Sequence, residues 1–402
     1  MKILITTDWY APVINGVVTS VLNLTDGLRA LGHEVRILTL SENLHSHTED
    51  NVTYIGAVGV GKVYPDARLR TARAMRYFDA LVRWRPDIVH SQCEISTFRL
   101  AARIADCCDA PLVHTYHTVY EDYTHYFSPS VRVGKAVVSR LSRLLLNHTD
   151  AVIVPSEKTR ELLLSYGVET PLHVVPTGID LARFTTPYPQ TELAALRAAL
   201  GFSPEDTVLL YLRRLAQEKH VDTLLSLLSQ HELPTLKLLI VGDGPARSAL
   251  EEEAAQLHLW ERVRFAGMVS PEDVPAYYQL ADVFISASQS ETQGLTYIEA
   301  MASGLPLLCR ADPCLTPFIR GSINGCLFTD AASFSEELTW LLASAQRRLE
   351  IGRAAQRTAL ARYNTDAFAE HVLAVYRSAL RRDLQQPGLA PGWAGSFGGR
   401  CV

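Results

Sequence analysis

The stretch SQSETQGLTYIEAMASGLP, residues 288–306, contains two glutamates, Glu291 and Glu299, that stand eight positions apart around a Gln-Gly-Leu turn. A pattern of apolar residues with helical spacing follows the turn, and Gly304 ends it. The spacing therefore predicts a short helix, with Glu291 in the loop before it and Glu299 in its early turns.

The start of this helix offers backbone N–H groups at Gly294, Leu295 and Thr296. Unpaired N–H groups and the positive end of a helix dipole attract phosphate. A carboxylate on either side can accept hydrogen bonds from ligand hydroxyl groups. A ligand that has a diphosphate between two sugars is a nucleotide sugar. Taken alone, the segment fits an ordinary capped surface helix better, and the rest of the chain has to support the nucleotide-sugar interpretation.

Short apolar runs alternate with helix-length stretches along the chain. In the first half, strands are expected at 2–6, 35–40, 52–55, 88–90, 112–116, 151–155 and 172–175, with helices at 18–31 and 69–83 among them. In the second half, strands are expected at 208–212, 237–241, 263–265, 283–285 and 307–309, with helices at 221–229, 246–257 and 296–302. This rhythm predicts an α/β fold with two Rossmann-like, doubly wound parallel sheets that face each other across a ligand cleft.

The same pattern suggests where the domains begin and end. We expect an N-terminal domain over 1–178 and a C-terminal domain over 183–364, with a hinge at 176–180. An amphipathic helix over 365–383 is expected to cross back to the N-terminal domain. The tail over 384–402 is rich in proline and glycine and is expected to be disordered.

Composition restricts the class of protein. The chain has 402 residues, 48% of them hydrophobic and 20% charged, which is typical of a soluble protein of two domains. It contains no apolar run near the ~20 residues of a membrane span, and its N-terminal apolar run is too short for a signal peptide. We therefore expect a cytoplasmic protein. The net charge of −5 argues against a nucleic-acid partner.

Other polar segments follow predicted strands. Gly16 lies in the loop after the first strand, and His117 lies in HTYHTVYEDY, residues 114–123. Arg214 and Lys219, in RRLAQEK at 213–219, are candidate phosphate clamps, although a solvated loop with an ion pair is equally compatible. No metal site is expected, because no acid has helical spacing to both histidines of residues 114–123 and no Cys-x-x-Cys pair occurs. The run GAVGVGKV at 56–63 resembles a P-loop but has Val63 where a hydroxyl is required, so we expect a loop there.

These segments, in this order and spacing, resemble glycosyltransferase family 4, the retaining enzymes of GT-B fold, over residues 1–382. Within that family the chain is most similar to bacterial 1,2-diacylglycerol 3-alpha-glucosyltransferases. The strings at 114–123, 155–159 (PSEKT) and 291–306 carry the likeness. The resemblance implies that the C-terminal domain binds a UDP-sugar and the N-terminal domain binds the acceptor.

The resemblance also implies roles for single residues. Glu299 corresponds to the ligand of the ribose, Glu291 to the ligand of sugar hydroxyls at the reacting centre, and His117 to the histidine beside that sugar. The remaining donor-binding positions are the diphosphate amides and the residues around them: Gly16, Arg214, Lys219, Gly294, Leu295 and Thr296. Two positions depart from the family pattern, since Arg213 replaces a usual Gly or Ser and His220 replaces a common Asn.

The implied reaction transfers a hexose, glucose in the closest branch, from UDP to diacylglycerol with retention and without a metal or other cofactor. Both glutamates are expected to bind the donor, so neither is expected to act as a nucleophile. A family 4 enzyme with a soluble or polyprenyl-linked acceptor remains an alternative. A non-catalytic nucleotide-sugar-binding protein is a further alternative, from a different class.

Basic residues gather in two stretches. Residues 62–85 hold seven of them against two acids, and residues 127–148 hold four with no acid, interleaved with Val and Leu. Basic amphipathic helices suit the surface of an anionic membrane. The alternative is that their apolar sides pack on the N-terminal sheet. We expect peripheral membrane association.

Overall fold

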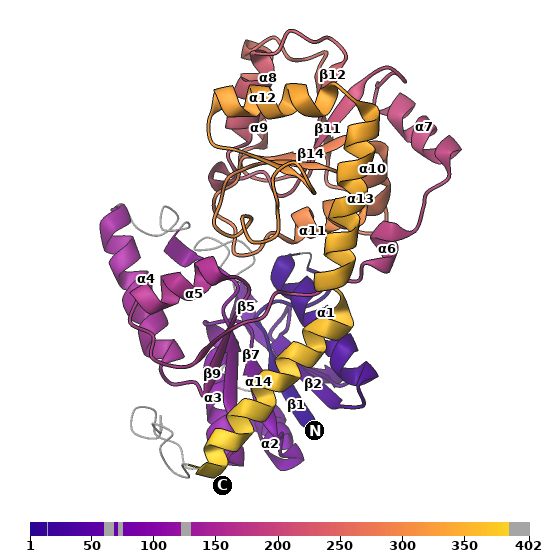
Figure 1. Cartoon of the computed structure of the whole chain (residues 1–402). Helices are drawn as coiled ribbons and strands as arrows, with labels where there is room; N and C mark the ends of the chain where they lie inside the picture. The colour runs from indigo at the N-terminus through magenta and orange to yellow at the C-terminus, as the bar shows by residue number, and fades with distance from the viewer. Residues whose placement is uncertain (14, 60–67, 71–74, 122–129, 386–402) are drawn as a thin grey trace. The chain divides into compact units, whose positions relative to one another are not determined.

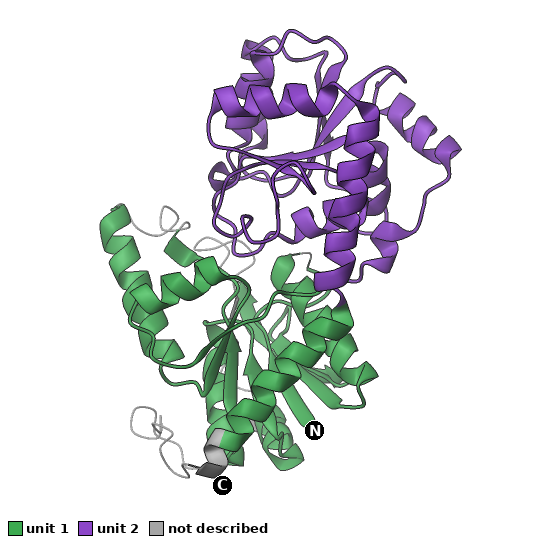
Figure 2. Ribbon diagram, in the orientation of Figure 1, with its two compact units in different colours: residues 1–179, 365–402 green, residues 180–364 purple. Residues whose placement is uncertain are grey.

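The computed structural model describes residues 1–13, 15–59, 68–70, 75–121 and 130–385 (Figure 1). The chain divides into two compact units (Figure 2): unit 1 comprises Met1–Ile179 with the segment from Thr365 onward, and unit 2 comprises Asp180–Asn364. Each unit is built on a largely parallel sheet, so the predicted α/β fold class is confirmed.

The described part of unit 1 contains an eight-stranded sheet of order β10-β9-β8-β7-β1-β2-β4-β3. Its pairs are parallel except for β3 with β4. The strands are β1 Lys2–Thr6, β2 Glu34–Leu40, β3 His47–Glu49, β4 Val52–Ile55, β7 Ile88–Ser91, β8 Leu112–Thr115, β9 Ala151–Val154 and β10 Leu172–Val174. The helices include α1 Gly16–Ala30, α2 Met75–Trp84, α3 Ser96–Cys108, α4 Val131–Leu146, α5 Glu157–Ser165 and α14 Thr365–Gln385.

The C-terminal helix α14 completes the core of unit 1. It lies beside α1 (Figure 1), and its buried side chains, Val372 and Tyr376 among them, join those of α1 and β1 in one apolar cluster. The approach of the two helices is close: a Cβ on Gly27 would stand 2.8 Å from the Cβ of Ala369. The helix continues to Gln385, so the first two residues of the predicted tail are helical.

The described part of unit 2 contains a six-stranded parallel sheet of order β13-β12-β11-β14-β15-β16. Its strands are β11 Thr207–Leu212, β12 Leu236–Val241, β13 Val263–Gly267, β14 Val283–Ser286, β15 Leu307–Arg310 and β16 Cys326–Phe328. The helices are α6 Ala182–Thr185, α7 Gln190–Ala199, α8 Val221–Ser229, α9 Arg247–Gln256, α10 Val274–Leu280, α11 Leu295–Ala302, α12 Ala331–Leu342 and α13 Ala345–Arg362. Long apolar runs in β11 and β12 form the core because both faces of the sheet are covered.

The segment around the near-P-loop differs from expectation. Ala57–Gly59 forms strand β5, which pairs in antiparallel fashion with β6, Arg68–Arg70. The predicted helix at 69–83 is therefore wrong in its first residues, and its described part begins at Met75. Strand pairing with β5 overrides the helical pattern there. A Cβ on Gly56 would lie 2.2 Å from the carbonyl oxygen of Leu44, so close packing of two backbones explains this glycine.

Candidate functional site

In unit 2, the candidate site forms where the order of the strands reverses. Strand β11 has β12 on one side and β14 on the other, and all three run parallel. The loops after β11 and β14 therefore meet at the carboxyl edge of the sheet, the usual ligand site of such folds. The first loop carries Arg213, Arg214 and Lys219, and the second carries Glu291.

Glu291 anchors these two loops together through one oxygen. Its Oε1 accepts hydrogen bonds from Lys219 Nζ at 2.9 Å and from Ser288 Oγ at 2.6 Å. Arg213 Nη1 forms an ion pair with the same oxygen at 2.6 Å. The carboxylate is buried at 4% exposure. Within the described residues, Oε2 has no hydrogen-bond partner, and it is not among the oxygens sealed from solvent. It is therefore the oxygen available to a ligand.

Charge keeps Glu291 ionised in spite of its burial. Burial by itself raises the pKa of this carboxyl, but the adjacent Arg213 and Lys219 together with the Ser288 hydrogen bond hold the pKa well below its usual range. Burial also disfavours the charged form of Lys219, and this lowers its pKa; the nearby Glu291 carboxylate acts in the opposite direction and raises that pKa. The buried Lys219 and the largely buried Arg213 thus share one buried carboxylate.

Arg213, the departure from the family pattern, belongs to this ion cluster. It neither lies free in the site nor points into solvent, since its side chain is only 15% exposed. Its backbone is fixed by the next loop, because a Cβ on Gly242 would stand 2.0 Å from the Arg213 carbonyl oxygen. Arg214, by contrast, is exposed and makes no ion pair with a residue that the structure describes. The other departure, His220, has a left-handed backbone with φ of 52°, a conformation that Asn adopts easily.

The start of α11 has the geometry of an anion site. Gly294 precedes the helix with φ of 79°, and a Cβ there would stand 2.2 Å from the Tyr297 ring. The N–H groups of Gly294, Leu295 and Thr296 donate to no acceptor in the described part of the chain. Free N–H donors at a helix start favour a bound anion.

Glu299 lies one turn further along α11. Its Oε2 accepts a hydrogen bond of 2.8 Å from the Tyr278 hydroxyl. Burial raises the pKa of this carboxyl, which is the opposite direction from that of Glu291. The two glutamates therefore differ in environment: one is fixed by two cations, and the other is held by a single neutral donor.

In unit 1, the order of the strands reverses between β1 and β7. Gly16 follows β1 as the first residue of α1, after Asn15, whose side chain accepts a hydrogen bond from the Val18 N–H at 2.9 Å. His117 follows β8, the next strand beyond β7. Both residues thus lie beyond the carboxyl ends of parallel strands in the same sheet, but no direct contact joins them within the described residues.

His117 is the end of a chain of hydrogen bonds. Its Nε2 lies 2.7 Å from Gln92 Oε1, and Gln92 Nε2 lies 3.0 Å from His90 Nε2. His90 Nδ1 then lies 2.7 Å from the hydroxyl of Tyr376 on α14. Burial lowers the pKa of His117 to about 4, so its imidazole is neutral at physiological pH.

Glu94 and Gln92 are polar residues of this edge that the sequence analysis missed. Glu94 accepts a hydrogen bond of 2.5 Å from the Tyr120 hydroxyl and contacts His114 Nε2 at 3.3 Å. Both residues directly follow the apolar strand β7, and that position was the signal that could have identified them.

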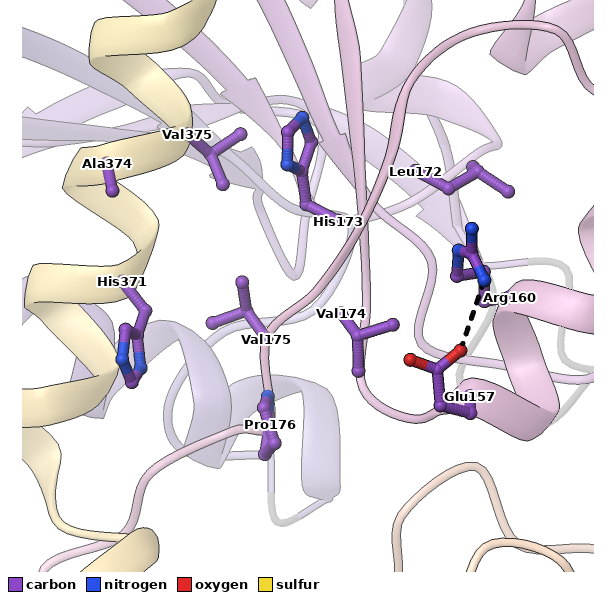
Figure 3. A pocket seen from close by; sticks show the side chains of 10 residues that line it. All are labelled: Glu157, Arg160, Leu172, His173, Val174, Val175, Pro176, His371, Ala374 and Val375. Atoms are coloured by element: carbon purple, nitrogen blue, oxygen red, sulfur yellow. Dashed lines mark hydrogen bonds and ion pairs between the residues drawn. The ribbon is translucent and has the colours of Figure 1, made fainter.

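We also searched the described residues for a metal site and for a pocket. Among the described residues, no group of three His, Cys, Asp or Glu side chains has the arrangement of a metal site. An open pocket of about 500 Å³ lies on unit 1 between α5, β10 and α14 (Figure 3). Glu157 and Arg160 form an ion pair of 3.4 Å in its wall, and His173 and His371 also line it. None of the predicted site residues lines this pocket.

Comparison with known proteins identifies the family. Residues 14–183 match the model of Glycosyltransferase Family 4, and residues 194–358 match that of Glycosyl transferases group 1. The chain is 37% identical to the alpha-monoglucosyldiacylglycerol synthase of Streptococcus pneumoniae over 82% of this chain and 75% of that protein. It is 31% identical to the alpha-monoglucosyldiacylglycerol synthase of Acholeplasma laidlawii over 96% of this chain and 97% of that protein.

Solved structures support the fold. The Anabaena protein Alr3699/HepE, crystallised with UDP and glucose, superposes with a TM-score of 0.74 at 18% identity, over 94% of this chain and all of that chain (100%). Sucrose-phosphate synthase from Thermosynechococcus elongatus also gives 0.74, at 22% identity over 95% and 99% of the two chains. With both sheets of the expected kind and relatives matching over most of its length, the chain belongs to glycosyltransferase family 4, the glycosyltransferases of GT-B fold.

Proposed function

We propose that this glycosyltransferase transfers glucose from UDP-glucose to diacylglycerol with retention of the anomeric configuration. The observation that carries the donor assignment is the pairing of Glu291 with Lys219 beside the open N–H groups of α11. In this proposal unit 2 binds the UDP-sugar and unit 1 binds the acceptor.

The residues of unit 2 suit the departure of UDP. As the anomeric C–O bond breaks, negative charge grows on the diphosphate and the sugar becomes oxocarbenium-like. The N–H groups of Gly294, Leu295 and Thr296 would donate to the diphosphate, and the exposed Arg214 would add a positive charge. Fixed donors of this kind contribute roughly 3–4 kcal/mol each to a transition state in which charge develops.

The two glutamates have binding roles in this mechanism. Glu291 would accept hydroxyl hydrogen bonds from the sugar through its free Oε2, while Oε1 keeps it in place. Glu299 would accept hydrogen bonds from the ribose diol. In a retaining glycosidase, a nucleophilic carboxylate attacks the anomeric carbon through one oxygen. Because Arg213, Lys219 and Ser288 hold the pKa of Glu291 well below its usual range against burial, its carboxylate is weakly basic and poorly suited to forming a covalent intermediate.

The relatives support a lipid acceptor. The two alpha-monoglucosyldiacylglycerol synthases match the chain at 31% and 37% identity, and they match over most of their own lengths. We therefore favour diacylglycerol over a soluble or polyprenyl-linked acceptor.

Helix α4 supports docking on a membrane. Its residues Val131, Val133, Val137, Leu141 and Leu144 are between 46% and 59% exposed. Its four basic residues, Arg132, Lys135, Arg140 and Arg143, are exposed as well. A solvent-exposed face that combines aliphatic and basic side chains suits an anionic bilayer. Among the described residues, no helix is long and apolar enough to span a membrane.

The second basic stretch is explained differently. In α2, the apolar residues Phe78, Leu81 and Trp84 are buried in the core of unit 1. Packing therefore accounts for the apolar side of α2, as the alternative interpretation of this stretch requires. Residues 62–67 and 71–74 of the stretch lie outside the described residues. We assign the membrane surface to α4.

The decisive experiment incubates the protein with UDP-glucose, UDP-galactose or UDP-N-acetylglucosamine and three acceptors, with mass spectrometry of the products. The acceptors are diacylglycerol in anionic vesicles, a polyprenyl phosphate in the same vesicles in place of diacylglycerol, and a soluble sugar. We expect glucosyl-diacylglycerol from UDP-glucose, with an α linkage by NMR. Transfer to the soluble sugar alone would refute the lipid acceptor, and donor binding without any transfer would favour the non-catalytic alternative.

Membrane docking has its own test, the sedimentation of the protein with anionic vesicles. Arg140→Glu combined with Arg143→Glu should release the protein from the vesicles, because each basic residue near the surface contributes about 1 kcal/mol. The matched control is charge reversal at Arg83 and Arg85, which belong to the stretch explained by packing. Equal sedimentation of the unaltered protein and the two charge-reversal variants would show that α4 is an ordinary surface helix and does not bind the membrane.

A further inference from the structure

The hydrogen-bonded chain behind His117 involves buried residues that have no role in the transfer described above. His90 and Tyr376 are fully buried, at 0% exposure, and Gln92 is 2% exposed. They come from different elements: His90 from β7, Gln92 from the loop after it, and Tyr376 from the C-terminal helix α14. The sequence distance between His90 and Tyr376 is 286 residues, so only the folded unit brings them together.

The direction of this chain follows from the groups that compose it. An amide oxygen only accepts hydrogen bonds, and an amide nitrogen only donates them. Since Gln92 Oε1 faces His117, the Nε2 of His117 must carry its proton. Since Gln92 Nε2 faces His90 Nε2, that nitrogen of His90 must carry a lone pair. The proton of His90 is then on Nδ1, and Nδ1 donates it to the Tyr376 hydroxyl oxygen.

The same pattern leaves one atom of His117 free. With the proton on Nε2, the lone pair of the neutral ring is on Nδ1. The Nδ1 of His114 is sealed from solvent without a partner, whereas that of His117 is not sealed and has no partner among the described residues. A hydroxyl group of a ligand can therefore donate a hydrogen bond to His117 Nδ1.

We propose that Gln92 and His90, anchored by Tyr376, are positioning residues that hold His117 in its Nε2–H tautomer and so present Nδ1 as an acceptor to a hydroxyl of the sugar or of the lipid. This inference rests on the proposed function for its effect on catalysis. The tautomer itself can be measured on the protein without any substrate, so the two can fail separately.

Thr115 reinforces the assignment. Its Oγ1 lies 2.7 Å from His90 Nε2, and a hydroxyl group there can donate to the same lone pair that Gln92 addresses. Burial lowers the pKa of His90 well below its ordinary value, and the pKa of His117 is lowered as well. Both rings therefore remain neutral at physiological pH, and a neutral ring is the form in which a tautomer is defined.

The test reads the tautomer of each histidine by two-bond ¹H–¹⁵N correlation NMR on protein labelled with ¹⁵N-histidine, with His117→Gln to assign the signal. In the unaltered protein we expect a pure Nε2–H form at His117. Gln92→Leu removes the acceptor and should give a mixture of tautomers. Gln92→Glu keeps an acceptor and should restore the Nε2–H form. An Nδ1–H form in the unaltered protein, or no change in Gln92→Leu, overturns the proposal.

Tyr376→Phe tests the far end of the chain. It removes the acceptor of the His90 proton, so His90 and then His117 should become mixtures of tautomers. Tyr116→Phe is the matched control. The Tyr116 hydroxyl is also buried in unit 1, but its partner is Ser142 Oγ at 3.3 Å, and it takes no part in the chain of hydrogen bonds behind His117. Circular dichroism shows whether each variant is folded. A folded Tyr376→Phe protein with unchanged His117, or an equal change in Tyr116→Phe, refutes the anchoring.

Enzyme kinetics provide a second test of the positioning role. Loss of a residue that orients a metal-bound histidine typically lowers activity about 10- to 100-fold, and we take the same scale for His117. We expect Gln92→Leu to lower kcat by that factor; a raised KM for the UDP-sugar as well would assign the hydroxyl to the sugar, and an unchanged KM would assign it to the lipid. If the protein proves inactive towards every acceptor, the proposed function fails and the tautomer measurement still decides the positioning role.

Discussion

Replacing Glu291 with Gln should destabilise unit 2 before any effect on catalysis is considered. The change keeps the shape of the side chain and removes its charge. Arg213 and Lys219, whose side chains are 15% and 9% exposed, would then be largely buried cations without a carboxylate. Removing one partner of a buried ion pair costs about 3–5 kcal/mol of unfolding free energy. We expect a loss in that range.

The measurement must follow unit 2 by itself, because a chain of two units need not unfold in one step. Urea-dependent hydrogen exchange, read by mass spectrometry on peptides from β11 and β14, reports the free energy of opening at the site. Glu299→Gln is the matched control, since it makes the same change on the same loop and helix. Burial raises the pKa of Glu299, and an amide oxygen can still accept the hydrogen bond from the neutral Tyr278 hydroxyl, so we expect a change within about 1 kcal/mol.

A second variant checks the cause. Adding Arg213→Met to Glu291→Gln removes one of the two stranded cations, and the double variant should therefore be more stable than Glu291→Gln alone. Coupling between residues of one network is typically about 0.5–3 kcal/mol. A loss below about 1 kcal/mol for Glu291→Gln, or a double variant less stable than the single one, would show that the ion cluster does not hold the loops.

The pH dependence has a definite sign. Because the native pKa of Glu291 is held low, its contribution is complete above the unfolded pKa of about 4.3 and is lost as the pH falls toward the native value. The gap between the unaltered protein and Glu291→Gln should be constant above about pH 5 and should shrink by roughly 1.4 kcal/mol per pH unit below about pH 4. A gap that widens on acidification would contradict the assignment.

Three other predictions concern single residues. Gly294→Ala should cost about 1–3 kcal/mol and weaken UDP binding by calorimetry, because its Cβ would meet the Tyr297 ring; Gly304→Ala, with the same φ of 79° and a nearest neighbour at 3.9 Å, should be milder in stability and neutral in binding. Glu299→Ala should weaken UDP binding about 10- to 100-fold, as expected for hydrogen bonds to a charged group, and unchanged affinity would remove it from the donor site. The native pKa of His117, about 4, lies below its unfolded value of about 6.5, so stability should fall as the pH drops between these values, and His117→Gln should reduce that dependence in pH-dependent urea unfolding.

Most strands and helices of this fold can be predicted from local sequence patterns, whereas the contacts within the candidate site can be predicted only in part. The strands at 2–6 and 52–55 have the predicted bounds because short apolar runs between polar turns leave little freedom. The strand at 68–70 was missed because the helical pattern predicted for 69–83 covers the same residues, whereas pairing with β5 decides their conformation. The pairing of Arg213 with Glu291 could not be predicted either. It joins the loops after β11 and β14, which only the folded sheet brings together, and no single segment encodes that packing.

The position of α14 has a consequence for the order of folding. Unit 2 is one continuous stretch, Asp180–Asn364, whereas unit 1 is built from both ends of the chain. Domains usually fold in the order in which they are synthesised. Here the first segment to be made lacks Val372 and Tyr376, which cover α1 and β1, until the last helix has been translated. The domain begun first is therefore completed last, and nascent unit 1 keeps an apolar face that chaperones can recognise throughout the synthesis of unit 2.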